Sequence, residues 1–266
     1  PRMTYMTLEH GVTILATGAA ANRPEAYGLG THDAITTQKD LDAVIEDQPD
    51  YFKDKNQIVM IQCAGSREEG NPNCSRICCQ NAIKNALRIK ELDPEMKIFI
   101  LYRDMRTYGF SEEYYQEARN KGVQFIRFSL DSRPEVSVDN GQVSVFVHDP
   151  ILGQKLEIEA DHLALASGMI ADDETTEDLA MIFHISRTDD NYFLEDHIKL
   201  RPVDTAVRGI FIAGTAHGPK TIPESVTQAY AVAGRAQVML AKEKIELGAA
   251  VAKVEGEKCA ACLVCV

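Results

Sequence analysis

Short apolar stretches alternate with longer amphipathic ones in the first half of the chain. The apolar stretches have the length of strands and are apolar on both faces, which is typical of buried parallel strands. They are QIVMIQ at 57–62, KIFILY at 97–102 and VQFIRF at 123–128. The predicted helices lie at 36–47, with Thr36 or Thr37 as the cap, at 75–92 and at 111–120. This β-α-β-α-β order predicts an α/β fold with a parallel, doubly wound sheet.

The pattern changes after residue 130, where apolar and polar residues alternate along the chain. Residues 135–149 form two such runs around Asn140-Gly141, which predicts a tight hairpin because Asn-Gly favours positive φ. Two more strands are expected within 154–168, the second ending at Ser167-Gly168. A buried strand at 209–215 and a helix from about 224 to 247 complete the prediction. The middle of the chain is therefore expected to be an antiparallel meander.

Charge and hydropathy exclude several functional classes. The 266-residue chain has a formal net charge of -12, whereas nucleic-acid-binding domains carry basic patches. No run approaches the roughly 18 apolar residues that a membrane-spanning helix needs, and the first residues do not have the pattern of a signal peptide. We therefore expect a cytoplasmic location and no nucleic-acid partner. The chain begins without Met, so we expect it to be part of a longer protein.

The seven cysteines fall into two clusters, which indicates metal or redox chemistry rather than a disulfide scaffold. The first cluster is Cys63, Cys74, Cys78 and Cys79, and the second is Cys259, Cys262 and Cys265. The first cluster follows a predicted strand, where a dinucleotide-binding domain has G-x-G-x-x-G. Gly65 has no second glycine at that spacing, and Glu68 and Glu69 would repel a diphosphate. NAD(P) is therefore not expected there.

Four thiolates are the usual ligands of a [4Fe–4S] cluster, which the first cysteine cluster favours. Cys74 and Cys78 are four residues apart, so we expect one helical face to present both. The positive end of that helix would favour thiolates. A zinc site, a redox dithiol or disulfide, and buried inert thiols remain alternatives, although adjacent cysteines are awkward for zinc.

The second cysteine cluster has the spacing C-x2-C-x2-C. This spacing opens the ferredoxin-type run C-x2-C-x2-C-x3-C-P, whose fourth cysteine is absent from the chain. The last residues are therefore predicted to begin a ferredoxin-like [4Fe–4S] module.

Three predicted strands end in a small residue beside glycine, as in flavoproteins whose backbone lies close to the flavin. A helix follows the third strand, with Pro223 expected at its first position, Thr221 or Ser225 near its cap, and its N-terminus facing the flavin. Lys220 is either a charge partner of the flavin or a surface residue. The candidate FAD-binding residues are Thr17, Gly18, Gly168, Gly214, Thr215, Gly218, Lys220, Ile222, Pro223, Glu224, Ser225 and Gln228.

Four stretches together resemble the A-type component of heterodisulfide reductase and its relatives. They are QCAGSRE…NCSRICCQNAIKNA, YRDMRTYGFSEEYYQEA, LRPVDTAVRGIFIAGTAHGPKTIPESVTQA and EKCAACLVCV. The resemblance implies a thioredoxin-reductase-like, two-dinucleotide-domain flavoprotein fold that holds FAD. It also implies a [4Fe–4S] cluster in the domain that elsewhere binds NADPH, with Cys63, Cys74, Cys78 and Cys79 as ligands.

The resemblance also implies a division of the chain and a set of partners. Part of the FAD domain is expected at 1–50, the cluster-carrying unit at 51–170, the rest of the FAD domain at 171–247 and the ferredoxin-like start at 248–266. In such proteins FAD splits an electron pair between two acceptors. The expected partners are ferredoxin and two further subunits of an oligomeric complex, one disulfide-reducing and the other of the hydrogenase or formate-dehydrogenase type.

Two alternative functions remain open at this point. One is a related electron relay, without bifurcation, in a quinone-interacting or other dehydrogenase complex. The other is a zinc-stabilised binding module with no redox role. Arg103, Asp104 and Arg106 of YRDMRTYG are interpreted either as surface ion pairs or as a docking site for another protein of the complex.

Overall fold

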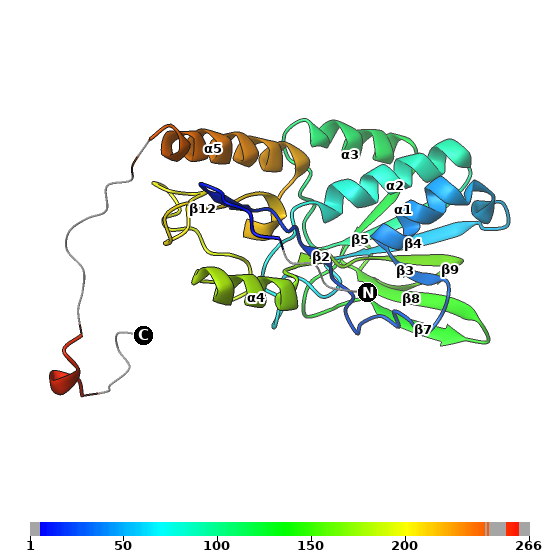
Figure 1. Cartoon of the computed structure of the whole chain (residues 1–266). Helices are drawn as coiled ribbons and strands as arrows, with labels where there is room; N and C mark the ends of the chain where they lie inside the picture. The colour runs from blue at the N-terminus through cyan, green and yellow to red at the C-terminus, as the bar shows by residue number, and fades with distance from the viewer. Residues whose placement is uncertain (1–5, 243, 245–253, 261–266) are drawn as a thin grey trace.

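The computed structural model describes residues 6–242, 244 and 254–260, and its main body is a five-stranded parallel sheet (Figure 1). The strand order is β3-β10-β4-β5-β6. These strands are β3 (Ile35–Thr37), β10 (His162–Ala166), β4 (Gln57–Gln62), β5 (Lys97–Tyr102) and β6 (Gln124–Arg127). One face carries the helices α1 (Gln38–Asp47), α2 (Cys78–Leu92) and α3 (Ser111–Asn120). The other face carries the meander β7 (Glu135–Asp139), β8 (Gln142–Asp149) and β9 (Gln154–Ala160).

Strand β4 shows why this sheet needs apolar residues on both faces. Ile58 and Met60 pack in the core under the helices, whereas Val59 and Ile61 pack in the core against the meander. All four side chains are fully buried. Successive residues of a strand point to opposite faces, so the continuous apolar run fills both cores. The predicted α/β fold with a parallel sheet is confirmed, but the sheet is not doubly wound, because the meander rather than a second layer of helices covers its other face.

The predicted hairpin and the helix at 36–47 are also present. Asn140 and Gly141 both have positive φ, 51° and 83°, between the paired strands β7 and β8. Thr37 is the N-cap of α1, and its hydroxyl and the Asp40 carboxylate form a capping box. Both features follow from local side-chain chemistry.

Two helix ends differ from the prediction. Helix α2 begins at Cys78 rather than near residue 75, because Arg76 has a left-handed φ of 65°. The expectation that Cys74 and Cys78 share a helical face is therefore wrong. Helix α5 (Ile222–Leu240) ends before residue 247, with Ala241 as its C-cap, while 243 and 245–247 lie outside the described residues.

A smaller unit is built around the parallel pair β1 (Thr13–Leu15) and β12 (Ile210–Ile212). Helix α4 (Asp173–Phe183) packs in one core beside this pair, and α5 packs in another. Two short antiparallel strands, β2 (Ala20–Ala21) and β11 (Met169–Ile170), lie where the chain crosses between the two units. Short 3-10 turns occur at η1 (Pro49–Phe52), η2 (Gly214–His217) and η3 (Gly256–Lys258).

The predicted division of the chain at residues 50, 170 and 247 stays a prediction. Segment 1–50 contributes to both units, because β1 pairs with β12 whereas β3 and α1 belong to the larger sheet and its helical layer. None of the helices in the described part of the chain is both long and apolar enough to cross a membrane.

We expect Ile100→Ala to lower the free energy of unfolding by about 2–5 kcal/mol, because the change leaves a cavity in the core. The side chain of Ile100 is fully buried between the sheet and the helices. Ile151→Ala is the matched control, since Ile151 is 91% exposed. Urea denaturation followed by circular dichroism measures both, and equal losses would contradict the described core.

His162 should make stability fall in acid. Its ring lies between the Tyr51 hydroxyl at 2.8 Å and the Thr36 hydroxyl at 2.9 Å, and burial lowers its pKa to about 4. Between that value and its ordinary pKa of 6.5 the unfolded chain binds the proton and the folded chain does not. Stability from this group is therefore lost as the pH falls from about 6.5 to 4, by up to about 3 kcal/mol.

Urea denaturation at pH 7 and pH 4.5 tests this prediction in the wild type and in His162→Gln, whose side chain does not titrate. The variant should lose less stability on acidification than the wild type. His148→Gln is the control, because His148 is exposed. An identical acid loss in the wild type and in His162→Gln would contradict the prediction.

Candidate functional site

The four cysteines of the first cluster line one small cavity between the end of β4 and the start of α2. Cys63 directly follows the strand, Cys74 lies in the connecting loop, and Cys78 and Cys79 open the helix. We call this space the cysteine cavity. The carboxyl end of a parallel strand and the N-terminus of the next helix meet here, which is where such sheets bind their ligands.

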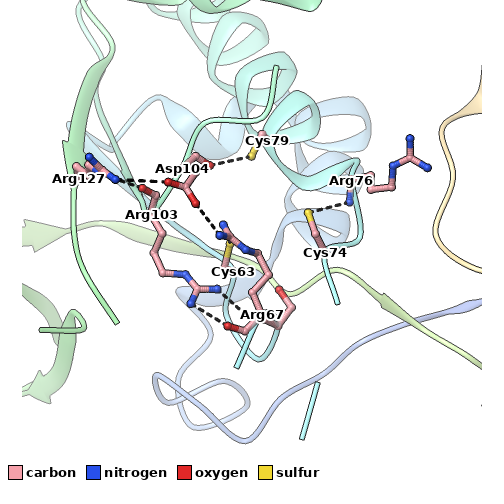
Figure 2. Close-up of polar contacts among 9 residues, drawn as sticks. Cys63, Arg67, Cys74, Arg76, Cys79, Arg103, Asp104 and Arg127 are labelled. Carbon is pink, nitrogen blue, oxygen red and sulfur yellow. Dashed lines mark hydrogen bonds and ion pairs between the residues drawn. The ribbon is translucent and has the colours of Figure 1, made fainter. Parts of the chain in front are cut away.

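Polar groups of the chain contact three of the sulfur atoms (Figure 2). The Arg67 guanidinium approaches Cys63 Sγ to 3.8 Å, and the Arg76 amide donates to Cys74 Sγ at 3.4 Å. The Cys79 thiol donates to the carbonyl oxygen of Asp104 at 3.8 Å. Two of these sulfur atoms, in Cys63 and Cys74, therefore accept hydrogen bonds from the surrounding loop, whereas Cys79 donates one.

Burial and mutual proximity keep two of these thiols protonated in the absence of a cation. Burial, followed by the charges of Cys79, Cys63 and Cys74, raises the pKa of Cys78 to about 12. Burial also raises the pKa of Cys79 to about 11. Four thiolates in one cavity repel one another, and a positively charged centre relieves that repulsion.

The cysteine loop has an unusual backbone. Cys63, Arg67 and Arg76 all have φ near 60°, the left-handed region that side chains other than glycine rarely adopt. Gly65 also has positive φ, and a Cβ there would lie 2.5 Å from a side-chain atom of Pro24. Such conformations persist only where surrounding contacts hold them, and they concentrate at functional sites.

Arg103 supplies two of the contacts that hold the loop. Its guanidinium donates to the carbonyl oxygens of Arg67 at 2.9 Å and Ser66 at 3.0 Å. Asn22 and Asn71 add side-chain hydrogen bonds to the carbonyl oxygen of Gly65. These four bonds use only backbone acceptors of the loop.

Asp104 connects the loop to the neighbouring strand. It pairs with Arg67 at 2.6 Å and with Arg127 at 3.5 Å, and the hydrogen bond from Arg67 holds the pKa of its carboxyl below the usual range. Asp104 and Arg106 line the cysteine cavity, so this part of YRDMR contributes to its wall. The two interpretations of Arg103, Asp104 and Arg106, as ion pairs or as a docking site, stay predictions. Sequence reasoning missed Arg67, although it stands four residues after Cys63.

Gly168 packs against the cysteine loop. A Cβ at this position would lie 2.2 Å from Ser75 Oγ and 3.7 Å from Cys78 Sγ. The next amide, of Met169, donates to Ser75 Oγ at 2.9 Å. The crossing segment therefore needs glycine to approach the cavity, and Ser75 is a second contact that the sequence did not reveal.

A groove of about 800 Å³ lies beside the cavity, between α2, α3 and the start of α5. Three candidate flavin residues, Lys220, Ile222 and Pro223, line it. Burial and the nearby charge of Arg76 lower the pKa of Lys220, so this lysine is not an ordinary surface residue. The volume is in the range of small-molecule pockets.

The ends of β1 and β12 bring together another group of candidate flavin residues. A Cβ on Gly18 would lie 3.9 Å from Thr215 Oγ1, and one on Gly214 would lie 4.0 Å from Ser225 Oγ. The Gly214 amide donates to Gln228 Oε1 at 2.7 Å. These residues form a turn at the carboxyl edge of the pair, where a ligand can approach the backbone.

The remaining candidates have other surroundings. Thr17 is exposed after β1, and Gly218 is buried, with its carbonyl 3.5 Å from Lys220 Nζ. Glu224 completes a capping box with Thr221, the N-cap of α5, and forms an ion pair with Arg76. Pro223 is the second helical residue rather than the first.

The second cysteine cluster lies largely beyond the described part of the chain. Cys259 is exposed and follows the turn η3, with its amide donating to the Gly256 carbonyl at 3.3 Å. Cys262 and Cys265 lie outside the described residues. Their role as cluster ligands stays a prediction.

In metal-free protein, we expect iodoacetamide to modify Cys78 and Cys79 much more slowly than Cys259. The thiolate is the reactive species, and Cys78 and Cys79 are held as buried thiols with raised pKa values. Cys259 is exposed and serves as the internal control. Peptide mass spectrometry at pH 8 follows each site, and equal rates at all three would contradict the described burial.

Proteins with similar sequences identify the family of this chain. No family model matches the chain. It is 38% identical, over 97% of its length, to an iron–sulfur A-type component of CoB–CoM heterodisulfide reductase from Methanopyrus kandleri. It is 37% identical, over 98% of its length, to the A-type component of the H(2)/formate:CoB–CoM heterodisulfide,ferredoxin reductase from Methanococcus maripaludis. The chain spans only 41% and 42% of these two relatives.

Solved structures show the same fold at low sequence identity. Lactococcus lactis thioredoxin reductase matches with a TM-score of 0.57 and 20% identity, over 86% of this chain and 66% of that one. T. acidophilum thioredoxin reductase matches with a TM-score of 0.53 and 16% identity, over 86% and 64%. The predicted thioredoxin-reductase-like fold is confirmed. The chain, which spans 41% of the first relative, belongs to the family of heterodisulfide reductase A-type (HdrA) proteins.

Proposed function

We propose that the chain is the flavin- and cluster-binding part of an oxidoreductase that transfers electrons in a heterodisulfide-reductase-type complex. One observation carries the proposal: a cavity lined by four cysteines and a groove lined by candidate flavin residues meet at two consecutive residues of the chain. Ile77 lines the groove, and the next residue, Cys78, lines the cavity. Arg76, on the cavity wall, also pairs with Glu224 in the first turn of α5. Two redox groups in these places would be neighbours.

The donor set of the cysteine cavity fits a [4Fe–4S] cluster. Four cysteines around one space are its usual ligands. A zinc ion would need all four sulfur atoms about 2.3 Å from one point. Within the described residues, no group of three or more side chains is arranged to hold a metal ion as it stands, so the fit rests on the donor set rather than on ligand geometry. Adjacent cysteines such as Cys78 and Cys79 are awkward ligands for zinc, which favours the cluster.

The groove and the adjoining turn fit FAD. Apolar side chains of α2 and α3, namely Ile83, Leu87 and Tyr114, line the groove among polar ones, and Lys220 adds positive charge beside the start of α5. The helix N-terminus adds its own positive potential. Gly18 and the Gly214-Thr215 turn leave the backbone open to close approach. When bound, FAD supplies the exchange between electron pairs and single electrons.

The wider complex follows from the names of the relatives. The name of the Methanococcus maripaludis relative refers to H(2)/formate, CoB–CoM heterodisulfide and ferredoxin. By analogy, the partners proposed for this chain are ferredoxin and two further subunits, one disulfide-reducing and the other of the hydrogenase or formate-dehydrogenase type. We propose that FAD splits electron pairs between two acceptors in this oligomeric, cytoplasmic complex.

Cys78→Ala should remove one cluster from anaerobically purified protein. Loss of one ligand from the cavity is expected to lower iron and sulfide by about four atoms each per chain, because a cube is lost as a unit. Iron, acid-labile sulfide and flavin are measured together with the visible spectrum. The flavin content should change far less than the iron content, since the groove residues are untouched.

Ile151→Ala is the control, because it changes an exposed side chain that belongs to neither cysteine cluster. This variant should retain the iron and sulfide that Cys78→Ala loses. Unchanged iron in Cys78→Ala, or zinc in place of iron in the wild type, would overturn the cluster assignment. Wild-type protein free of flavin would overturn the FAD assignment.

A further inference from the structure

The sulfur atoms of the cysteine cavity have hydrogen-bond donors of two kinds. The donor to Cys74 is the backbone amide of Arg76, at 3.4 Å from its Sγ. The donor to Cys63 is different, because it is the charged side chain of Arg67. Substitution can remove this contact without altering the peptide backbone.

Arg67 is shared between the cavity and a carboxylate. One guanidinium nitrogen lies 3.8 Å from Cys63 Sγ, and another lies 2.6 Å from Asp104 Oδ2 (Figure 2). The Arg67 side chain is only 18% exposed, whereas that of Asp104 is 46% exposed. Solvent therefore screens the charge of Arg67 less than it screens a surface arginine.

One-electron reduction places an additional negative charge inside the cavity. A positive charge and a hydrogen-bond donor beside a ligand sulfur stabilise that reduced state and raise the reduction potential. The Asp104 carboxylate, on the other side of the same guanidinium, offsets part of this effect. The two residues therefore act on the potential in opposite directions.

We propose that Arg67 sets the reduction potential of the group bound in the cysteine cavity, and that Asp104 moderates the effect of Arg67. The inference rests on the proposed function, because it takes a [4Fe–4S] cluster as the occupant. It assigns Arg67 a tuning role, with no direct part in binding iron.

Several contacts that hold the loop do not involve the Arg67 side chain. The Arg103 guanidinium binds the carbonyl oxygens of Ser66 and Arg67, and the Asn22 and Asn71 side chains bind that of Gly65. All four bonds remain available when the Arg67 side chain is replaced. A change of potential can thus be separated from a loss of the loop.

The test is a pair of variants with opposite expected signs. Arg67→Gln should shift the midpoint potential of the cavity cluster to a more negative value, because the positive charge is removed. Asp104→Asn should shift it to a more positive value, because the guanidinium loses its offsetting charge. Dithionite titration with mediators, followed by electron paramagnetic resonance, gives both midpoints on the anaerobic protein.

Arg133→Gln is the matched control. Arg133 pairs with Glu68 of the same loop and does not line the cavity. The cluster of Arg133→Gln should therefore have the midpoint potential of the wild type. If Arg67 and Asp104 acted only by holding the loop, the midpoint potentials of Arg67→Gln and Asp104→Asn would shift in the same direction, or the signals of both variants would broaden. Either result, or an unchanged midpoint in Arg67→Gln with its iron retained, overturns the inference.

Two further outcomes separate a failure of the inference from a failure of the proposed function. If Arg67→Gln loses its iron, the Asp104→Asn variant decides alone. A midpoint potential of Asp104→Asn at or below the wild-type value then overturns the inference. If the wild type itself holds no cluster that depends on Cys78, the proposed function fails, and the tuning role fails with it.

Discussion

The turn from β4 to α2 must bring four cysteine side chains to one cavity, and much of the surrounding structure depends on this constraint. An ordinary strand-to-helix connection places one or two side chains at the end of the sheet. Here the loop from Cys63 to Cys78 bends back through several left-handed residues, so that Cys63 and Cys74 face the first residues of the helix. Such a backbone is unfavourable by itself and needs outside contacts to persist.

Those contacts come from segments far apart in the sequence. Arg103, at the end of β5, holds the carbonyl groups of the loop, and Asp104 holds the Arg67 side chain. Gly168, on the crossing segment, allows Ser75 to pack closely. The position that a dinucleotide-binding domain gives to a glycine-rich phosphate loop is therefore occupied by a sulfur-lined cavity. The loss of the glycine pattern and the gathering of the thiols therefore concern the same strand-to-helix turn.

The sequence predicted the parts of this arrangement that depend on local patterns. Strand β4 was predicted because Ile58 to Ile61 are apolar on both faces, and the hairpin because Asn140-Gly141 favours its turn. The clustering of the cysteines was visible from their spacing. The start of α2 was predicted wrongly, because the residues before Cys78 have good helical spacing and only tertiary contacts place Arg76 in the left-handed region. The ligand role of each candidate residue remains a prediction.

The contacts of Arg76 and its neighbours also have a consequence for the relation between the two units. Arg76 of the cysteine loop pairs with Glu224 of α5, and Asn73 donates to Asp190 at 2.6 Å. Both contacts join the loop of the larger unit to the smaller one, beside the strand pair β2 and β11. On the proposed function, they fix the separation between flavin and cluster. Because electron tunnelling falls steeply with distance, the rate of transfer between the two groups would then depend on these few polar contacts.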